Sequence, residues 1–140
     1  MEDLSLHILD IVENSIRAKA KNVYIYFKFQ RKGDGLIIEI IDDGEGMDEE
    51  LTEKIKNPFF TSKEGKKFGL GIPFLKQSAE ETGGFLEIES EKGKGTKIKA
   101  FFHKDHIDMK PLGDIEKTIE ILQATNPDIN IFFEVEECHF

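Results

Sequence analysis

The chain has 140 residues, with 28 acidic against 19 basic side chains, so its formal net charge is −9 at pH 7. A chain of this length is typical of one domain with its own hydrophobic core. The excess of acid argues against nucleic-acid binding, because phosphates would be repelled. The N-terminus lacks a signal-peptide pattern, and no apolar run approaches the roughly 20 residues that a membrane span requires. We therefore expect one cytoplasmic domain, with neither nucleic acid nor a membrane as its partner.

The first predicted element is an amphipathic helix over Leu4–Ala20, whose apolar residues recur at steps of three and four. Asp10, Asn14 and Arg17 lie on a separate polar stripe of this helix. Residues four apart face one point in space, and an amide oxygen beside a carboxylate suits Mg²⁺ or a metal-associated water. Taken alone, such a stripe is more often a solvated helix surface.

Two strands are predicted next, over Val23–Phe29 and Leu36–Ile41, and the turn between them makes an antiparallel hairpin. The second strand ends in Asp42–Met47, a loop with the pattern D-x-G-x-G. The Asp42 carboxylate only accepts hydrogen bonds, so it can hold the amino group of an adenine. Glycines let the backbone approach a flat ring, although a tight acidic turn explains them as well.

A short helix over Asp48–Lys54 and a connector over Asn57–Phe68 follow. The connector is long for a compact domain, which favours a functional lid. The next helix, over Leu70–Thr82, begins beside Gly69 and Gly71, where exposed amides and the helix dipole favour a phosphate. The pattern matches neither the dinucleotide fingerprint nor the Walker A motif. The predicted apolar face of this helix comprises Leu70, Phe74, Leu75 and Ala79.

A second antiparallel hairpin is predicted over Phe85–Ser90 and Thr96–His103. Beyond it, Asp114 is expected to cap a further helix. A last strand over Ile129–Val135 either joins the sheet or pairs with another chain, which would give a homodimer. Together the elements predict an α+β fold: a two-layer α/β sandwich with a mixed, mostly antiparallel sheet and helices on one face.

Five motifs occur in this order along residues 4–102: ILDIVENSIRAKA, DDGEGM, PFFTSK, FGLGIPFLKQSAEETGG and GKGTK. They resemble the N, G1, F, G2 and G3 boxes of the GHKL ATPases, which include gyrase-type topoisomerases, heat-shock chaperones, histidine kinases and mismatch-repair proteins. The stretch PFFTSKEGKKFGLGI is especially similar to the lid and G2 region of histidine-kinase catalytic domains. The resemblance implies the GHKL ATP-binding fold, with ATP and Mg²⁺ bound.

The resemblance assigns a role to each matching position. Asn14 matches the asparagine that binds Mg²⁺ between the phosphates, and Asp42 matches the aspartate that holds the adenine amino group. Asp10 stands where hydrolytic and serine-kinase members have a glutamate as general base, so we expect a weaker base or a differently placed acceptor. The other predicted nucleotide contacts are Arg17; Gly44, Gly46 and Met47 lining the base; Phe59, Phe60 and Lys63 in the lid; Gly69, Leu70 and Gly71 at the phosphates; and Thr96 near the base.

The length indicates which kind of GHKL protein to expect. It leaves no room for a transducer domain, and Met1–Leu6 are too few to form the phosphoacceptor hairpin of a sensor kinase. We therefore predict a stand-alone ATP-binding domain in signal transduction, with residues 103–140 as a C-terminal αβ extension and a protein as its partner. It is either a protein kinase, of the split histidine-kinase or anti-sigma serine-kinase type, or a non-catalytic switch whose lid ATP orders.

Overall fold

The computed structural model describes residues 4–30, 35–57, 71–103 and 111–138. The predicted helices and strands are all present. None of the helices in these ranges is long and apolar enough to cross a membrane. In chain order the elements are α1 (Leu4–Arg17), β1 (Asn22–Gln30), β2 (Gly35–Asp42), α2 (Glu49–Lys54), α3 (Gly71–Glu81), β3 (Phe85–Glu91), β4 (Gly95–His103), α4 (Pro111–Thr125) and β5 (Asn130–Cys138).

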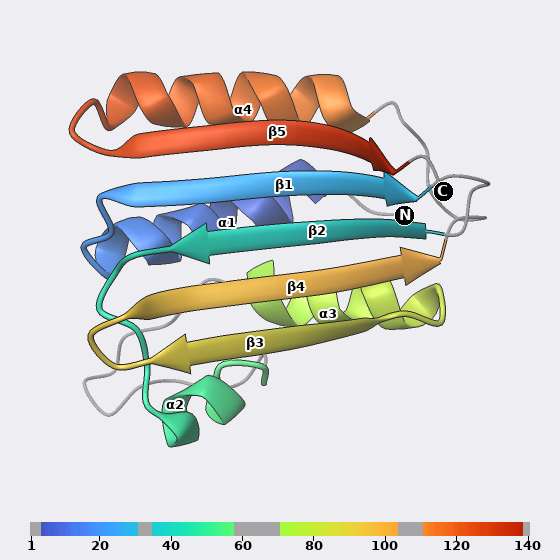
Figure 1. The fold of residues 1–140 in the computed structure, drawn as a ribbon, viewed down its shortest axis with the longest axis horizontal. Helices are drawn as coiled ribbons and strands as arrows, with labels where there is room; N and C mark the ends of the chain where they lie inside the picture. Colours follow the sequence, from blue (N-terminus) through green and yellow to red (C-terminus); the bar gives the residue numbers. More distant parts are fainter. Residues whose placement is uncertain (1–3, 31–34, 58–70, 104–110, 139–140) are drawn as a thin grey trace.

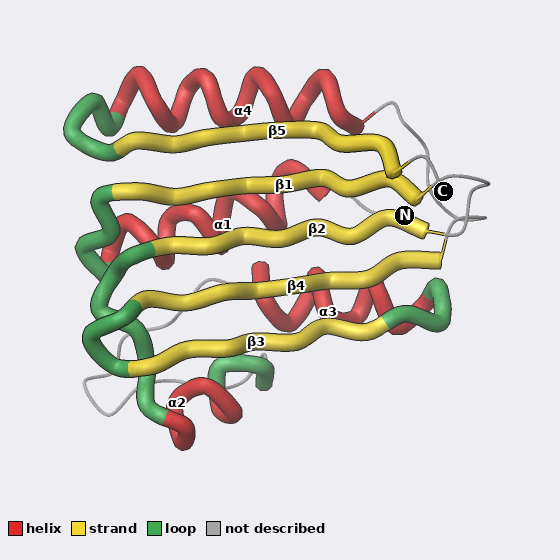
Figure 2. The backbone as a smooth tube through the Cα atoms, viewed as in Figure 1, coloured by secondary structure: helices red, strands yellow, loops and turns green. Residues whose placement is uncertain are grey.

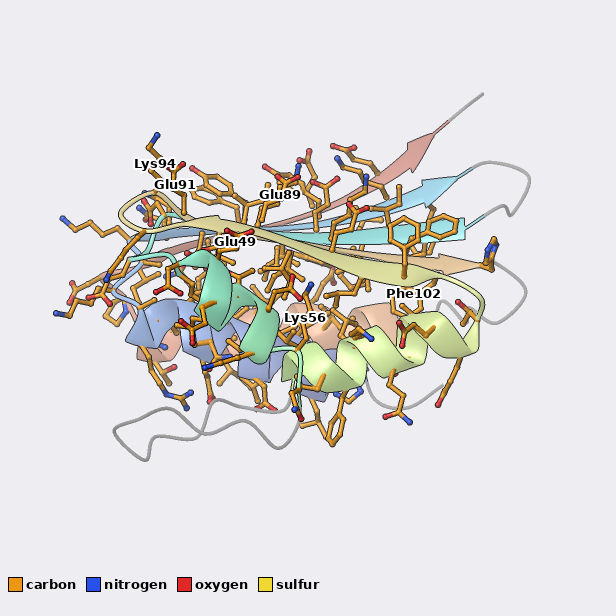
Figure 3. The ribbon with its side chains drawn as sticks, turned by 90° about the horizontal axis from the view of Figure 1, so that it is seen from below. Glu49, Lys56, Glu89, Glu91, Lys94 and Phe102 are labelled. Carbon is orange, nitrogen blue, oxygen red and sulfur yellow. The ribbon has the colours of Figure 1, made fainter. Side chains whose placement is uncertain are left out.

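The strands form one sheet in the order β3-β4-β2-β1-β5 (Figures 1 and 2). The pairs β1–β2, β2–β4 and β3–β4 are antiparallel, whereas β5 runs parallel to β1. The helices α1, α3 and α4 lie together on one face of the sheet, as the side view in Figure 3 shows. The predicted two-layer sandwich is therefore confirmed, and the last strand joins the sheet of its own chain.

A hydrophobic core fills the space between the sheet and the helices. Every second residue of the central strands faces this core, such as Phe27 in β1 and Ile38 in β2, which are 1% and 0% exposed. Because side chains alternate along a strand, polar residues lie on the opposite side, which we call the open face. There the carboxylate of Glu39 lies 2.9 Å from the Lys28 ammonium and 3.9 Å from that of Lys97.

Two predicted helix boundaries are wrong for local reasons. The helix α1 ends at Arg17 rather than Ala20, because Lys19 takes a left-handed conformation (φ 64°) that closes it. The helix α4 begins at Pro111, a residue whose fixed φ and missing amide hydrogen suit the first turn. Asp114 therefore lies inside α4 rather than before its first residue.

The apolar face predicted for α3 is also wrong in part. Leu75 and Ala79 are fully buried, as predicted, and Ile72 joins them at 2% exposure. Phe74 instead is 39% exposed, and its ring meets the ring of His7 edge-on, with centroids 5.7 Å apart. The buried face of α3 therefore runs through Ile72, Leu75 and Ala79, and Phe74 is a partly exposed residue beside His7 of α1.

Candidate functional site

The first helix and the second strand meet at a short hydrogen bond. Ser15 Oγ in α1 donates to Asp42 Oδ2 at the end of β2 over 2.6 Å, and the Gly44 amide donates to Asp42 Oδ1 over 2.9 Å. Ser15 is only 3% exposed, so a buried donor holds the carboxylate toward the helix layer. Because Asn14 directly precedes Ser15, the helix turn with the predicted magnesium ligand lies against the predicted adenine ligand.

Ser15 is a candidate site residue that the sequence interpretation missed. A signal for it exists, since Ser15 follows Ile11 by one helical turn on the apolar face of α1. A polar side chain on a buried face requires a hydrogen-bond partner inside the protein. The sequence does not identify that partner, which lies 27 residues further along the chain.

Backbone crowding accounts for both glycines of the D-x-G-x-G loop. At Gly44 a Cβ atom would lie 2.8 Å from the carbonyl oxygen of Ala18. Gly46 has a φ of 70°, and a Cβ atom there would overlap the carbonyl oxygen of Glu91. The loop thus packs backbone against backbone on α1 and on the turn between β3 and β4, a reason for glycine independent of any bound ring.

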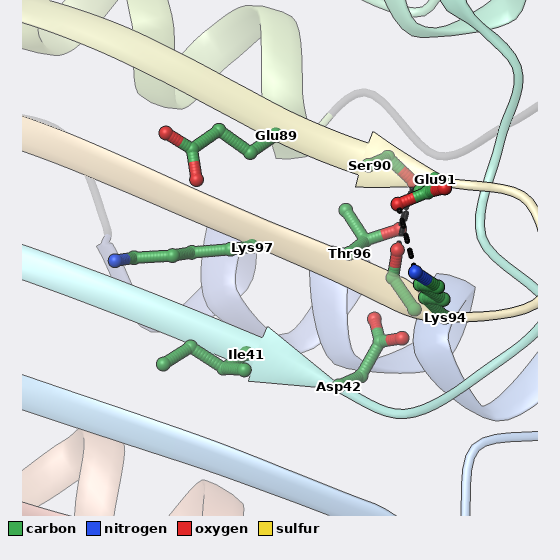
Figure 4. Close-up of a pocket in the computed structure, with 9 residues that line it drawn as sticks. Ile41, Asp42, Glu89, Ser90, Glu91, Lys94, Thr96 and Lys97 are labelled. Carbon is green, nitrogen blue, oxygen red and sulfur yellow. Dashed lines mark hydrogen bonds and ion pairs between the residues drawn. The ribbon is translucent and has the colours of Figure 1, made fainter.

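Three polar side chains form a row across the strand ends beside this loop. Asp42 of β2, Thr96 of β4 and Ser90 of β3, which we call the polar row, are direct partners in the sheet register. The Thr96 and Ser90 hydroxyl oxygens share a hydrogen bond of 2.8 Å (Figure 4), and the Met47 amide donates to Ser90 Oγ over 2.8 Å. The structure therefore brings together the base contacts predicted at Asp42, Met47 and Thr96.

Among the described residues, the side-chain amide of Asn14 has a hydrogen-bond partner for its oxygen but none for its nitrogen. Its Oδ1 accepts a hydrogen bond from Arg17 Nη1 over 3.0 Å, and Arg17 Nη2 lies 3.5 Å from a Glu13 carboxylate oxygen. Its Nδ2 is buried, and no described residue hydrogen-bonds to it. A bound ligand that accepts a hydrogen bond would remove the cost of leaving this group unpaired.

The residues around Asn14 fit Mg²⁺ as part of a nucleotide complex. Within the described ranges, no three acidic, histidine or cysteine side chains converge into a metal site of their own. Mg²⁺ commonly takes one or two protein oxygens and completes its shell with phosphate oxygens and water. Asn14 Oδ1 suits that role, because the Arg17 side chain, which now donates to it, is 61% exposed and has room to turn toward a phosphate.

The start of α3 packs against α1 next to Asp10. A Cβ atom added at Gly71 would lie 2.8 Å from Asp10 Cβ and 3.0 Å from Ile11 Cγ1. Only glycine allows so close an approach without displacing α1. The positive end of the α3 dipole and the half-buried Asp10 side chain are therefore neighbours, as expected for a phosphate position beside a general base.

A hollow of about 300 Å³ lies at the same end of the sheet, but on the open face (Figure 4). Two sets of register partners line it: Ile41, Lys97 and Glu89, and the three members of the polar row. The two sets alternate along the same strands, so their side chains point to opposite faces. The hollow therefore adjoins the polar row, while Ile41, Glu89 and Lys97 lie on the sheet face away from α1.

Part of the predicted site lies outside the described residues. The lid stretch and the residues before α3 belong to it, and their roles stay predictions. These positions are Phe59, Phe60, Lys63, Gly69 and Leu70.

Asp43, next to Asp42, has a structural role at the opposite edge of the loop. Its Oδ1 accepts from the Lys21 and Asn22 amides over 2.8 and 2.9 Å, and its Oδ2 accepts from Asn22 Nδ2 over 2.8 Å. Burial raises the pKa of Asp43, but the hydrogen bonds from Asn22 and Lys21 outweigh it and hold this pKa below its ordinary value of 3.8. Asp43 therefore fastens the loop to the start of β1.

We expect Asp43→Asn to reduce the free energy of unfolding at neutral pH but less so in acid. A carboxyl whose pKa is lowered by folding stabilises the native state above its unfolded pKa, and this contribution is lost as the pH falls through the native value. Urea unfolding from pH 7 down to pH 3 measures the difference between wild type and variant. A difference that stays constant below pH 4 would contradict the assigned hydrogen bonds.

The sandwich, with an acidic loop and a glycine-started helix both packed on the first helix, is that of a GHKL ATPase domain. The profile of the family described as histidine kinase-, DNA gyrase B-, and HSP90-like ATPase matches residues 2–106, so the chain belongs to this family.

The similar curated proteins include kinases. The chain is 36% identical over 101 residues to the sensor kinase CckA of Brucella abortus, and 35% identical over 88 residues to sporulation kinase C of Bacillus subtilis. These matches cover 69% and 63% of the chain but only 11% and 20% of the two kinases. The chain thus corresponds to a small part of each.

Two solved structures share the fold. The MutL ATPase domain of Aquifex aeolicus, complexed with ADP, has a TM-score of 0.58 and 19% identity, covering 93% of this chain and 58% of that one. The catalytic domain of the histidine kinase ThkA, in a nucleotide-free form, has a TM-score of 0.53 and 27% identity, covering 71% and 65%. The likeness to MutL concerns the fold alone.

Proposed function

We propose that the chain binds Mg·ATP where α1, the 42–47 loop and the start of α3 meet, and transfers the γ-phosphate to a partner protein. The observation that carries this proposal is the 2.6 Å hydrogen bond between Ser15 and Asp42, which joins the two segments at opposite ends of the nucleotide. Family membership, the two kinase relatives and the ADP in the MutL structure support it.

The adenine end of the proposed site is the polar row with Met47. Asp42, fixed by Ser15 and the Gly44 amide, accepts a hydrogen bond from the 6-amino group. Met47 is partly buried against the core and offers a polarisable apolar surface to the ring. Burial of the ring between such a surface and a fixed acceptor supplies both affinity and orientation.

The phosphate end lies along α1. Asn14 and Arg17 contact the phosphates, and the α3 N-terminus at Gly71 adds a favourable dipole. Mg²⁺, held by Asn14 Oδ1, neutralises charge on the phosphates when it is bound. We assign to Asp10, half-buried beside Gly71, the role of accepting a proton from an attacking hydroxyl.

The acceptor in this proposal is a residue of a separate protein. Two relatives are a sensor kinase and a sporulation kinase, and the chain corresponds to a small part of each. We infer a stand-alone role in the cytoplasm, where ATP is available. A homodimer stays a prediction, with the outer edge of β5 as the surface for a second chain.

One observation favours a second function, a non-catalytic switch. Asp10 replaces the glutamate of hydrolytic members and is one methylene shorter, so its carboxylate reaches less far from α1. A domain with a weak base binds ATP without consuming it and changes its affinity for a partner instead.

Transfer of labelled γ-phosphate separates the two functions. The chain is incubated with Mg²⁺, γ-labelled ATP and purified candidate acceptor proteins, and the stability of the label in acid and base is recorded. Acid-labile, base-stable label indicates phosphohistidine, whereas acid-stable label indicates phosphoserine. Binding of ATP without labelled protein in any mixture would support the switch and contradict the kinase.

The Asp10→Asn variant tests the role of the carboxylate. A neutral imidazole attacks with its own lone pair, whereas a serine hydroxyl must lose its proton, a step that a positioned base accelerates about 100-fold or more. We therefore expect Asp10→Asn to reduce serine labelling by about that factor and to leave histidine labelling within about threefold. Equal losses for both acceptors, at unchanged ATP affinity, would contradict a base role for Asp10.

A further inference from the structure

The hydrogen bonds of Ser90 determine where the Thr96 proton points. Ser90 Oγ donates to the Gly95 carbonyl over 2.9 Å, accepts from the Met47 amide over 2.8 Å, and lies 2.8 Å from Thr96 Oγ1. A hydroxyl has one proton and two lone pairs, and a carbonyl oxygen cannot donate. The single Ser90 proton is therefore used on Gly95, and the hydrogen bond with Thr96 must run from Thr96 to Ser90.

Because Thr96 donates to Ser90, Thr96 and Asp42 face each other with hydrogen-bond acceptors only. The Thr96 proton points along the polar row toward Ser90, so Thr96 Oγ1 presents lone pairs to its other neighbour, Asp42. As a carboxylate, Asp42 has no proton to donate either, and its two oxygens already accept from Ser15 and Gly44. Directly paired residues place their Cβ atoms about 5 Å apart, so a single exocyclic group can meet both acceptors.

We infer that Ser90 is a positioning residue that makes the base site selective for a 6-amino purine over a 6-oxo purine. This inference rests on the proposed nucleotide site and adds the residue that sets its selectivity. The amino group of adenine has two hydrogens for two acceptors, whereas the 6-oxo oxygen of hypoxanthine or guanine would face acceptors only. Unpaired acceptors buried against each other cost affinity, so the site excludes the 6-oxo base.

The test compares Mg·ATP with Mg·ITP, whose base is hypoxanthine. Dissociation constants are measured by competition with a fluorescent ATP analogue for wild type, Ser90→Ala, Ser90→Thr and the double variant Ser90→Ala with Thr96→Val. In Ser90→Ala the Thr96 hydroxyl loses its acceptor and is able to turn its proton toward a 6-oxo oxygen. For Ser90→Ala we expect the ratio of the ITP to the ATP dissociation constant to fall about tenfold, which corresponds to the free energy of one hydrogen bond. Ser90→Thr should retain the wild-type ratio.

Loss of packing alone would give a different result. Ser90 also holds Met47 and Gly95, so a loosened loop lowers both affinities together and leaves their ratio unchanged. The gain in ITP binding should disappear in the double variant, because it depends on the Thr96 hydroxyl. A wild-type ratio in Ser90→Ala overturns the inference, whereas failure of the wild type to bind ATP overturns the proposed function instead.

A second variant covers the case in which Ser90→Ala does not fold. Thr96→Val keeps the shape of the side chain and the Ser90 contacts to Met47 and Gly95. It removes one acceptor, so ATP affinity should fall several-fold while ITP affinity does not fall. An equal fall of both would contradict the acceptor role of Thr96.

Discussion

Asp42→Asn is expected to weaken Mg·ATP binding about 100-fold, because a hydrogen bond to a charged group is lost and a donor faces the adenine amino group. The substitution preserves shape: the asparagine oxygen is able to accept from the Gly44 amide in place of Oδ1, and its NH2 group is able to donate to the Ser15 hydroxyl, which can also accept. The loss should therefore appear in affinity more than in stability. Isothermal titration calorimetry of the folded variant with Mg·ATP measures it.

Asp43→Asn is the matched control for this experiment. It makes the same chemical change one residue further along the loop, but that carboxylate bonds to Lys21 and Asn22 at the start of β1. We expect its ATP affinity to stay within about threefold of wild type while its stability falls. Equal affinity losses in both variants would mean that Asp42 acts through the loop and not through adenine.

Gly46→Ala should have the largest effect on stability among single changes in the loop. A left-handed φ of 70° costs about 1 kcal/mol for alanine, and the added Cβ atom would overlap the Glu91 carbonyl oxygen. Relief of that overlap requires the loop to part from β3, at a further ~3 kcal/mol. For a chain of this size the melting temperature should fall by roughly 10 °C or more.

Gly93→Ala separates the two contributions. Gly93 has a similar φ of 86°, but no atom lies within 4 Å of an added Cβ. Only the conformational cost of about 1 kcal/mol should remain. Thermal unfolding of both variants gives the comparison, and similar losses would show that contact between the loop and the β3–β4 turn is not what requires glycine at Gly46.

Local periodicity and motif order predict much of this molecule. The alternation in Val23–Phe29 and the three- and four-residue steps in α1 define their buried faces without reference to the rest of the chain. The order of the five motifs predicts that Asn14 and Asp42 serve one site, and the structure brings α1 against the end of β2. These features depend on short sequence windows, where pattern and structure correspond directly.

Features that depend on partners distant in the sequence were not predictable. Ser90 follows Leu86 and Ile88 on the inward face of β3, so alternation indicates a polar residue on that face. However, only the register with Thr96 and the approach of Met47 identify its partners. The steric need for glycine at Gly46 arises from β3, some 45 residues later. Phe74 had the right spacing for the core, but in the structure it is 39% exposed and packs against His7 of α1.

A crystal structure of the chain with Mg²⁺ and a non-hydrolysable ATP analogue tests the central claim most directly. The account predicts the 6-amino group within hydrogen-bond distance of an Asp42 carboxylate oxygen and the phosphates beside Asn14 and Gly71. A nucleotide whose base lies on the open face against Ile41 and Lys97, with no contact to Asp42, would contradict it.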